Sequence, residues 1–448
     1  MVRRAGLWIF TLSFAAALPS LVGSGGTPRA NAVVATEPDR DASSPAIALG
    51  SDLQSADPAA RACAARELGA RGVESIASVP GLVTLLADDT IVSMPDCIDD
   101  GEWHGGYDRV DDVIDRPTSP AREASRALSR IGAAAVQPLV TALGDVRATM
   151  RRYAVIALGL IDDHAVMKPA VARLETTLGD SDWQVRRSAV WALAGSGDAS
   201  AFGAIAGRLK DDYPRVREMA ARGLGRMEDR RAVTALSGAL GDPEWSVRRE
   251  VVHGLGQLHA SEAVDAIVQR LVDEHPEVRQ MAAWALGEIE DRRAAPGLRH
   301  ALADRDAKVR HQAAWALGQL KDGASIDALI AVIRQDEAAS VREISCWALG
   351  EIDDVRAVPG LTSALKDRDG SVRDMAAWAL GEVGSATAVE SLIGALKDPE
   401  WKVRAKAAWA IGEIADGRGA DALAASLKDE RAEVRQMAAW ALAEVSGH

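Results

Sequence analysis

Residues 278–291 read VRQMAAWALGEIED, and copies of this stretch recur along the chain at an almost constant step of 31 or 32 residues. Close copies begin at Val309, Val341, Val372, Val403 and Val434. Weaker copies begin at Met150, Val185, Val216 and Val247, and degenerate copies surround Leu68 and Leu128. Aligned on the leucine of the WALG motif, with Ile411 in its place once, there are twelve copies. Such a period predicts one array of stacked repeats.

Each copy is predicted to form a helical hairpin. Asp or Asp-Pro precedes the Val-Arg pair, as at Asp242-Pro243 and Asp398-Pro399, and these residues favour helix starts. A Gly follows the Ala-Leu pair, a turn follows with Asp and Gly or Arg, and a second apolar pattern with helical spacing comes next. Two helices cannot bury a core alone, so neighbouring copies must stack. The sequence therefore predicts an all-α, right-handed α-solenoid of about twelve stacked helical hairpins.

The N-terminal residues have the features of an export signal. Arg3 and Arg4 precede a mostly apolar run over 7–22, and Ala30-Asn31-Ala32 has the small-x-small form of a cleavage site. We expect a signal peptide over 1–32, a linker over 33–43, and a periplasmic or secreted mature protein; an uncleaved N-terminal anchor is the alternative. The apolar run is shorter than the roughly 20 residues of a membrane span, so no span is expected after cleavage.

The repeat pattern D-x-x-V-R-x-x-A-A-x-A-L-G-x-I resembles the short HEAT-like repeats named after phycobilin lyases, over residues 44–87 and 120–448. The chain thus resembles an exported bacterial member of that family. Two enzymes share the repeat. Deoxyhypusine hydroxylase needs paired His-Glu steps to hold iron, and no His-Glu dipeptide occurs here. Phycobilin lyases act in the cytosol, which conflicts with an export signal. A lyase-like enzyme is therefore the less favoured alternative.

An arginine recurs seven residues before the motif leucine in eleven of the twelve copies. A helical wheel places it on the core side of its helix, in the first turn. An anion-binding ladder is one interpretation. The resemblance to HEAT-like repeats implies instead an Asp–Arg ladder that joins adjacent units, and we assign the arginines to structure. This Arg column comprises Arg279, Arg310, Arg342, Arg373, Arg404 and Arg435, preceded by Arg61, Arg151, Arg186, Arg217 and Arg248.

The tryptophans need a separate explanation, since there are twelve of them against three Phe and three Tyr. Most lie two residues before the motif leucine, about 160° from it on the wheel, and are predicted to point away from the core. This Trp column comprises Trp284, Trp315, Trp347, Trp378, Trp409 and Trp440, with Trp191 as an earlier member. On the same face, two residues after the leucine, a Glu column comprises Glu288, Glu351, Glu382 and Glu413. In the middle copies Arg222 and His253 replace the Trp.

Rows of exposed Trp usually mark binding surfaces, and Trp beside carboxylates suits a cationic ligand. The Trp and Glu columns are predicted to line a concave wall that binds a protein or an extended peptide with positive charge. Nucleic acid is excluded by 65 acidic against 52 basic residues, a net charge of −13. The alternatives are a glycan-binding module, a purely structural spacer, or Trp rings that pack sideways between repeats.

Residues 88–119 interrupt the repeats with a predicted acidic insert loop, between a first repeat over 44–87 and the solenoid over 120–448. Its carboxylates do not have the spacing of a calcium loop, so no metal is expected. In an oxidising compartment Cys63 and Cys97 are candidates for a disulfide, whereas Cys346 replaces a core Ala and should be a free thiol. No motif for a nucleophile, a phosphate loop or a dinucleotide is present, so neither catalytic residues nor a cofactor are expected, and the chain is predicted not to be an enzyme.

Overall fold

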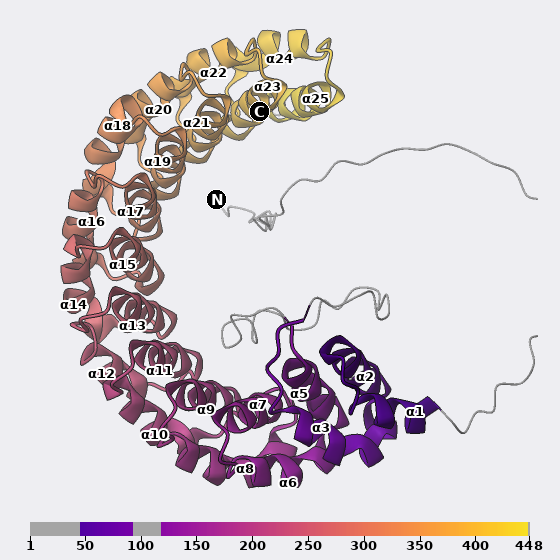
Figure 1. Cartoon of the computed structure of the whole chain (residues 1–448). Coiled ribbons are helices and arrows are strands. Elements are labelled where there is room, and N and C mark those ends of the chain that lie inside the picture. The colour runs from indigo at the N-terminus through magenta and orange to yellow at the C-terminus, as the bar shows by residue number, and fades with distance from the viewer. Residues whose placement is uncertain (1–44, 93–117, 447–448) are drawn as a thin grey trace, which may run out of the picture. The chain divides into compact units, whose positions relative to one another are not determined.

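The structure, a computed structural model, describes residues 45–92 and 118–446. These residues form α-helices and short 3₁₀ helices and contain no strand. The predicted all-α solenoid is confirmed (Figure 1). The predicted signal peptide, the linker and residues 93–117 of the acidic insert lie outside the described residues.

Within residues 45–92 and 118–446 the helices form two rows (Figure 1). The helices that carry the Val-Arg and WALG motifs form the inner row, on the inner side of the curve, and the helices that follow them form the outer row. The inner helices are α2 (Pro58–Arg71), α5 (Pro120–Ile131), α7 (Ala148–Gly159), α9 (Trp183–Gly195), α11 (Pro214–Arg226), α13 (Trp245–Gln257), α15 (Pro276–Ile289), α17 (Ala307–Gln319), α19 (Ala339–Ile352), α21 (Gly370–Val383), α23 (Trp401–Ile414) and α25 (Ala432–Ser446).

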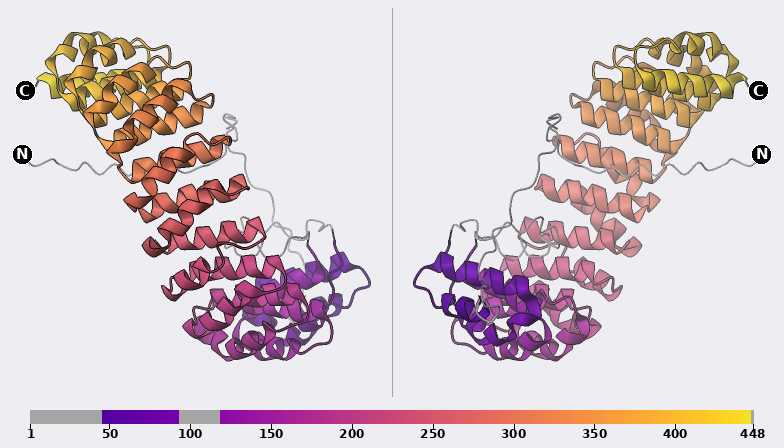
Figure 2. Two further views of the ribbon diagram at one scale, coloured as in Figure 1. Left: turned by 90° about the vertical axis from the view of Figure 1, so that its left-hand side faces the viewer. Right: turned by 90° about the vertical axis from the view of Figure 1, so that its right-hand side faces the viewer.

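The outer helices are mostly shorter. They are α1 (Pro45–Asp52), α3 (Val79–Leu85), α6 (Ala133–Ala142), α8 (His164–Thr177), α10 (Phe202–Gly207), α12 (Arg231–Ser237), α14 (Val264–Val268), α16 (Ala295–Ala301), α18 (Ile326–Gln335), α20 (Val358–Ala364), α22 (Val389–Ala395) and α24 (Ala420–Ser426). The side views in Figure 2 show the hairpins stacked one after another, so each repeat contacts its neighbours in sequence.

The predicted helix-start residues begin only some of the inner helices. Asp242-Pro243 and Asp398-Pro399 lie before the N-cap residues of α13 and α23, which are Glu244 and Glu400, and the two Asp carboxylates accept hydrogen bonds from the Arg column. Other inner helices follow the prediction. The Asp306 carboxylate accepts a hydrogen bond from the Lys308 amide at 2.8 Å, and Pro276 occupies the first turn of α15, where no amide donor is needed. Several inner helices end in a left-handed residue, such as Asp353 (φ 52°) or Gly384 (φ 63°). The Gly of the WALG motif lies before that point, inside the helix, so it does not make the turn.

The core lies between the two rows. The motif leucines Leu286, Leu317 and Leu349 are fully buried, as are Leu298 and Leu361 of the outer row. The buried apolar residues form one continuous cluster along the stack. Because every repeat shares its core with its neighbours, the stability of each repeat depends on the one beside it.

Candidate binding surface

The Arg column joins each repeat to the next. Arg342, only 4% exposed, donates from Nε and Nη2 to the two carboxylate oxygens of Asp367, both at 2.7 Å, and from Nη1 to the Asp336 carbonyl at 2.9 Å. Burial opposes ionisation of Asp367, yet its hydrogen bonds from Arg342 and the Asp369 amide hold its pKa below the usual range. The same pairing occurs in Arg151–Asp180, Arg186–Asp211, Arg217–Asp242, Arg248–Asp273, Arg279–Asp304, Arg310–Asp336, Arg373–Asp398 and Arg404–Asp429.

Both ends of the Arg column vary this arrangement. Arg61 donates from Nε to one carboxylate oxygen of Asp88 at 2.8 Å. Arg435, which is exposed, donates to the backbone carbonyls of Asp429 and Glu430 at 2.8 and 3.0 Å. Between these ends, each guanidinium lies between its own turn and the next one, and the ladder therefore acts as a repeat-to-repeat connector.

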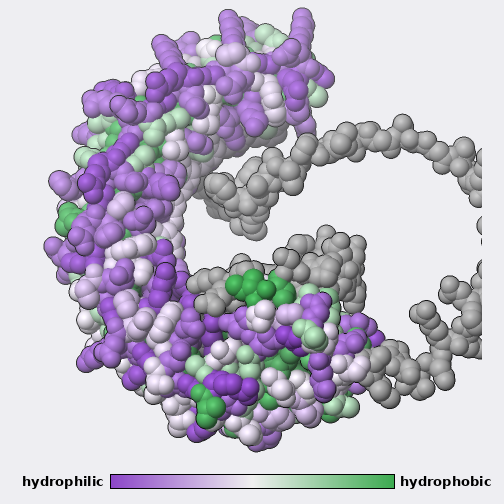
Figure 3. Space-filling model, in the orientation of Figure 1, coloured by the Kyte–Doolittle hydropathy of each residue, from purple (hydrophilic) through white to green (hydrophobic). Residues whose placement is uncertain are grey.

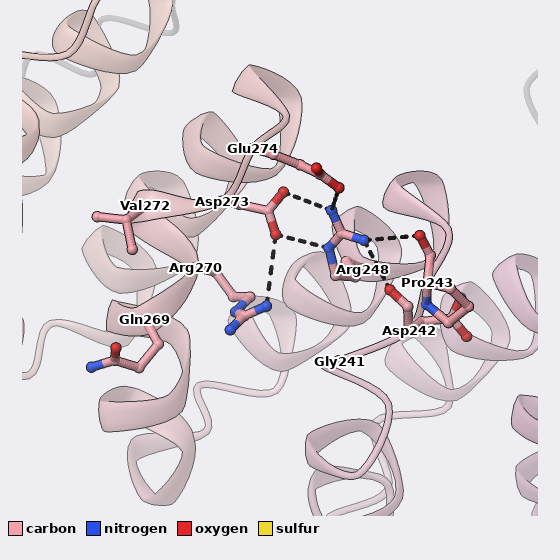
Figure 4. Close-up of a pocket in the computed structure, with 9 residues that line it drawn as sticks. All are labelled: Gly241, Asp242, Pro243, Arg248, Gln269, Arg270, Val272, Asp273 and Glu274. Atoms are coloured by element: carbon pink, nitrogen blue, oxygen red, sulfur yellow. Dashed lines mark hydrogen bonds and ion pairs between the residues drawn. The ribbon is translucent and has the colours of Figure 1, made fainter.

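An open pocket lies at one of these connections (Figure 4). Figure 4 shows the Arg248 guanidinium between Asp273 and Glu274 on one side and the carbonyls of Asp242 and Pro243 on the other. The arginine is therefore engaged on both sides by the ladder. We assign this pocket to the structural connector and not to a ligand site.

The Trp column does not stand free on the inner surface. Each ring leans onto the inner helix of the preceding repeat and covers the glycine of its WALG motif. The Trp378 ring lies so close to Gly350 that a Cβ added there would be 2.7 Å from Cζ3. The same contact joins Trp191 to Gly159, Trp284 to Gly256, Trp315 to Gly287, Trp347 to Gly318, Trp409 to Gly381 and Trp440 to Gly412.

This contact makes most of the tryptophans half-buried, where the sequence predicted rings that point away from the core. Trp191 is only 8% exposed, Trp440 is 37% exposed, and the five in between are intermediate. The wheel considers one helix in isolation, whereas each inner helix has a neighbour beside it that the long indole reaches. The interpretation of sideways packing between repeats thus describes one part of each ring's environment, and the exposed remainder faces solvent.

The sequence holds a signal for this packing that the wheel missed. Wherever a copy has Trp in its column position, the preceding copy has Gly directly after its motif leucine. Where the next copy carries Arg222 or Ile156 in place of Trp, the residue directly after the motif leucine is Ala194 or Ser129. The ring therefore requires a glycine in the preceding repeat, but glycine also precedes two copies without Trp, as Gly69 and Gly225 do before Arg126 and His253.

The Glu column places one residue on each of α15, α19, α21 and α23, and α17 has Gln319 in its place. Glu288 and Glu351 are half-buried, and Glu382 and Glu413 are more exposed but still partly covered. Partial burial raises the pKa of Glu382, and the neighbouring Glu413 and Glu351 raise it further by repulsion. Partial burial and then repulsion by Glu444 likewise raise the pKa of Glu413. The column therefore carries negative charge that its surroundings neutralise incompletely.

In the middle of the stack ion pairs replace the Trp column. Arg222 donates to Glu250 at 3.1 Å, and Arg249 donates to the other oxygen of Glu250 at 2.7 Å. Burial raises and these two arginines lower the pKa of Glu250, with a net lowering. His253 stacks at a tilt on Trp284, with ring centroids 5.1 Å apart, and burial lowers its pKa. This part of the inner surface is charged but internally paired.

A second group of aromatic contacts, at the amino ends of the inner helices, was not anticipated. Trp183 stacks on Tyr213 with centroids 4.8 Å apart, Trp245 stacks on His275, and the Arg431 guanidinium lies over Trp401. In each case a Trp two residues before the repeat valine meets a residue three before the valine of the next copy. These contacts join consecutive repeats and explain tryptophans outside the Trp column.

The remaining candidate residues have varied settings. Cys346 is a buried free thiol whose pKa is raised by burial. Cys63 carries a disulfide bond, while Cys97 lies outside the described residues, so the pairing stays a prediction. Within residues 45–92 and 118–446, no group of three potential metal ligands lies together, and no helix has the length and apolar character of a membrane span.

Figure 3 shows that one face of the stack is mostly hydrophilic, with hydrophobic residues in small separate patches. A broad apolar interface is thus absent from the described part of that face.

Comparisons with known proteins agree with this architecture. The family model described as HEAT repeats matches residues 170–245, 234–318, 298–373 and 358–443, which together exceed half of the chain. A search of curated protein sequences finds no significant match.

Solved structures give the same fold. The chain is similar to one from the structure in which Kap95p binding induces the switch loops of RanGDP to adopt the GTP-bound conformation (14% identity, TM-score 0.56). The match covers 89% of this chain and 60% of that chain. It also matches the CpcE and CpcF complex of phycocyanin lyase from Nostoc sp. PCC7120 (23% identity, TM-score 0.33, 50% of this chain and 92% of that one). Human deoxyhypusine hydroxylase in complex with glycerol matches as well (26% identity, TM-score 0.27, 56% and 97%). The first likeness shows the fold alone, and the other two superpose too loosely to support an argument.

Proposed function

Because this chain belongs to the HEAT repeat family, whose stacked repeats build extended binding surfaces, we propose that it is a non-enzymatic scaffold. It binds another protein or an extended peptide on the inner surface of α15 to α25. The observation that carries this proposal is the Trp column, with one ring on each of α15 to α25, together with a carboxylate on each of these helices except α17, which has Gln319.

The glycine contacts support binding by these rings. An indole held against the preceding helix has already lost its rotamer freedom, so a ligand that packs on the exposed part immobilises little more. Trp is also the residue type most often found among the dominant contacts of interfaces. The half-buried rings therefore serve two roles, since one part packs the solenoid and the other part is presented to a partner.

The charge of the surface indicates the charge of the partner. Glu351, Glu382 and Glu413 repel one another along the column, and a cationic partner would relieve that repulsion. Among the described residues, Lys321 approaches Glu351 at 3.7 Å, with a side chain that is 60% exposed. Such an exposed pair is weak, so the column retains a net attraction for Lys or Arg of another chain.

A cationic peptide tests this proposal. The probe is a blocked peptide of alternating Lys and Ser, with its Nε-acetylated form as the neutral control, titrated calorimetrically at low and high salt. The variant Glu351→Gln/Glu382→Gln/Glu413→Gln should bind about tenfold more weakly, since three charge pairs together contribute roughly 1.4 kcal/mol. Wild-type binding should weaken with salt.

The matched control removes the same charge from the outer row. Asp327→Asn/Glu390→Gln/Asp421→Asn changes three exposed carboxylates of α18, α22 and α24 and should bind like the wild type. Equal weakening by both variants would reduce the effect to net charge. Binding by neither peptide would contradict the cationic partner, and unaltered binding after substitution of the Trp column would favour a structural spacer.

The proposed location is extracytoplasmic, either periplasmic or secreted. It rests on the basic start, apolar run and Ala30-Asn31-Ala32 sequence of residues 1–32. Mass spectrometry of the mature protein from an expressing bacterium should find an N-terminus directly after residue 32. A full-length chain in the cytosol would contradict the export signal.

A further inference from the structure

One position of the inner surface already holds a cation. The Lys406 ammonium of α23 lies over the Trp409 ring of the same helix, 5.5 Å from the ring centroid. Asp374 and Glu382 of α21 interact electrostatically with this cation. Burial raises the pKa of Asp374, and Lys406 and Lys402 oppose that rise; Lys406 also opposes the rise at Glu382. This arrangement of a ring, two carboxylates and an ammonium shows how the surface accommodates a positive charge.

The preceding repeat contains the same site without its cation. Each residue of this group has an equivalent 31 residues earlier, on α21 and α19. Trp378 corresponds to Trp409. The carboxylates Glu343 and Glu351 correspond to Asp374 and Glu382. Since both pairs of helices have the same lengths and the same Gly–Trp contact, the equivalent groups are placed alike.

The two sites differ at the positions of the two lysines, Lys402 and Lys406. Ser371 takes the place of Lys402 and donates a hydrogen bond to Glu343 at 3.1 Å. Met375 takes the place of Lys406. Methionine has the unbranched stem of a lysine but no ammonium, so it retains the packing and leaves out the charge.

Other rungs of the inner surface lack the paired carboxylates. The residues that precede Trp347 in the equivalent positions are His311 and Gln319, and those that precede Trp440 are Ala405 and Glu413. In α15 to α25 the complete group therefore occurs at two rungs. One of them is filled by Lys406.

We propose that Trp378, Glu343 and Glu351 form a subsite for one alkylammonium or guanidinium side chain of the partner, placed as Lys406 is on Trp409. This inference rests on the proposed function and specifies where on the inner surface a positive side chain of the partner binds. The exposed Lys321 is the competitor that the ligand cation displaces from Glu351.

Exchanging the two residues between the rungs tests the proposal. Met375→Lys supplies a built-in cation and should weaken binding of the Lys-Ser peptide about tenfold, the equivalent of 1.4 kcal/mol. Lys406→Met empties the second rung and should tighten binding by several-fold. Affinity is measured by calorimetry, and circular dichroism and the thermal midpoint confirm that both variants fold.

Two controls separate this effect from packing and from net charge. Met375→Leu keeps an apolar residue of similar volume and should bind like the wild type. Met437→Lys adds the same charge at the equivalent position beside Trp440, where only one carboxylate precedes the ring, and should change the affinity less than twofold.

The outcomes distinguish this subsite from the scaffold function. If the wild type binds the peptide and Met375→Lys binds it equally well, or no more weakly than Met437→Lys, the subsite is refuted and the cation-binding scaffold stands. Absence of peptide binding by the wild type refutes both. Loss of binding by Met375→Leu would also overturn the subsite, because packing alone would then explain the effect.

Discussion

In α19 to α23 the residue two before the motif leucine is a Trp seated on a glycine of the preceding helix, whereas in α11 and α13 it is Arg222 or His253 amid ion pairs. The helices approach closely in both regions. Gly350 faces Ala379 in the first, and at the α9–α11 contact the order is reversed, with Ala194 facing Gly223. The comparison shows that close approach is common to both regions, while the residue at the Trp position varies.

The largest expected effect concerns what the two regions share. Arg217→Ala and Arg342→Ala should each lower the free energy of unfolding by about 3 kcal/mol, because each leaves a largely buried aspartate without its guanidinium. Urea unfolding followed by circular dichroism measures this. Arg356→Ala removes an exposed pair with Asp354 and should cost less than about 0.5 kcal/mol. If the free energies of unfolding of Arg217→Ala and Arg342→Ala differ by more than the effect of Arg356→Ala, the ladder does not contribute uniformly.

Two glycine-to-alanine substitutions should change the free energy of unfolding in opposite directions, because one glycine lies under a Trp ring and the other does not. Gly350→Ala places a Cβ 2.7 Å from the Trp378 ring and should destabilise the protein by about 1–3 kcal/mol. Gly394→Ala, in α22, meets nothing within 4 Å and should stabilise it by about 0.5–1 kcal/mol. The unfolding midpoints of the two variants should therefore lie on either side of the wild type. A stable Gly350→Ala variant would mean that the ring is free to move aside.

A transplant can convert one region into the other. Arg222→Trp alone brings an indole against the Cβ of Ala194 and loses an ion pair with Glu250. Adding Ala194→Gly creates the glycine contact found beneath the Trp rings of α19 to α23. The double variant should recover about 1 kcal/mol of unfolding free energy relative to Arg222→Trp. The coupling free energy comes from the four unfolding curves of the cycle. Strict additivity would show that the Gly–Trp association in the sequence reflects duplication and not packing.

The sequence predicted the fold because its signals are local and repeated. The step of 31 residues and the leucine spacing sufficed to predict helical hairpins that stack. The environment of the Trp column was not accessible to a wheel of one helix, since each ring packs on a residue of the preceding repeat, as Trp378 does on Gly350. A comparison of adjacent copies would have found it, because every copy with Trp in this position follows a copy with glycine directly after the motif leucine. The aromatic pairs such as Trp183 and Tyr213 were missed for the same reason.

The smallest expected effect is electrostatic and belongs to the acidic region alone. The pKa values of Glu382 and Glu413 are raised by partial burial and by repulsion, so their neutral forms are favoured in the folded state. The stability linked to them is present below their ordinary pKa of 4.5 and is lost as pH rises through the raised values. Glu382→Gln/Glu413→Gln should therefore be more stable than the wild type at pH 7, by about 0.5 kcal/mol after allowance for solvent screening.

That gain should disappear near pH 4, where the wild-type carboxyls are protonated. Ladder aspartates such as Asp367, whose pKa is lowered, lose their stabilising effect as pH falls further, but they do so equally in both proteins and cancel in the difference. Urea unfolding at pH 4 and pH 7 gives the two differences, with Glu390→Gln of the outer row as the control. A gain in stability that persists at pH 4 would come from the glutamine side chains and not from the removal of charge. The repulsion among the glutamates would then be too weak for a cationic partner to gain from relieving it.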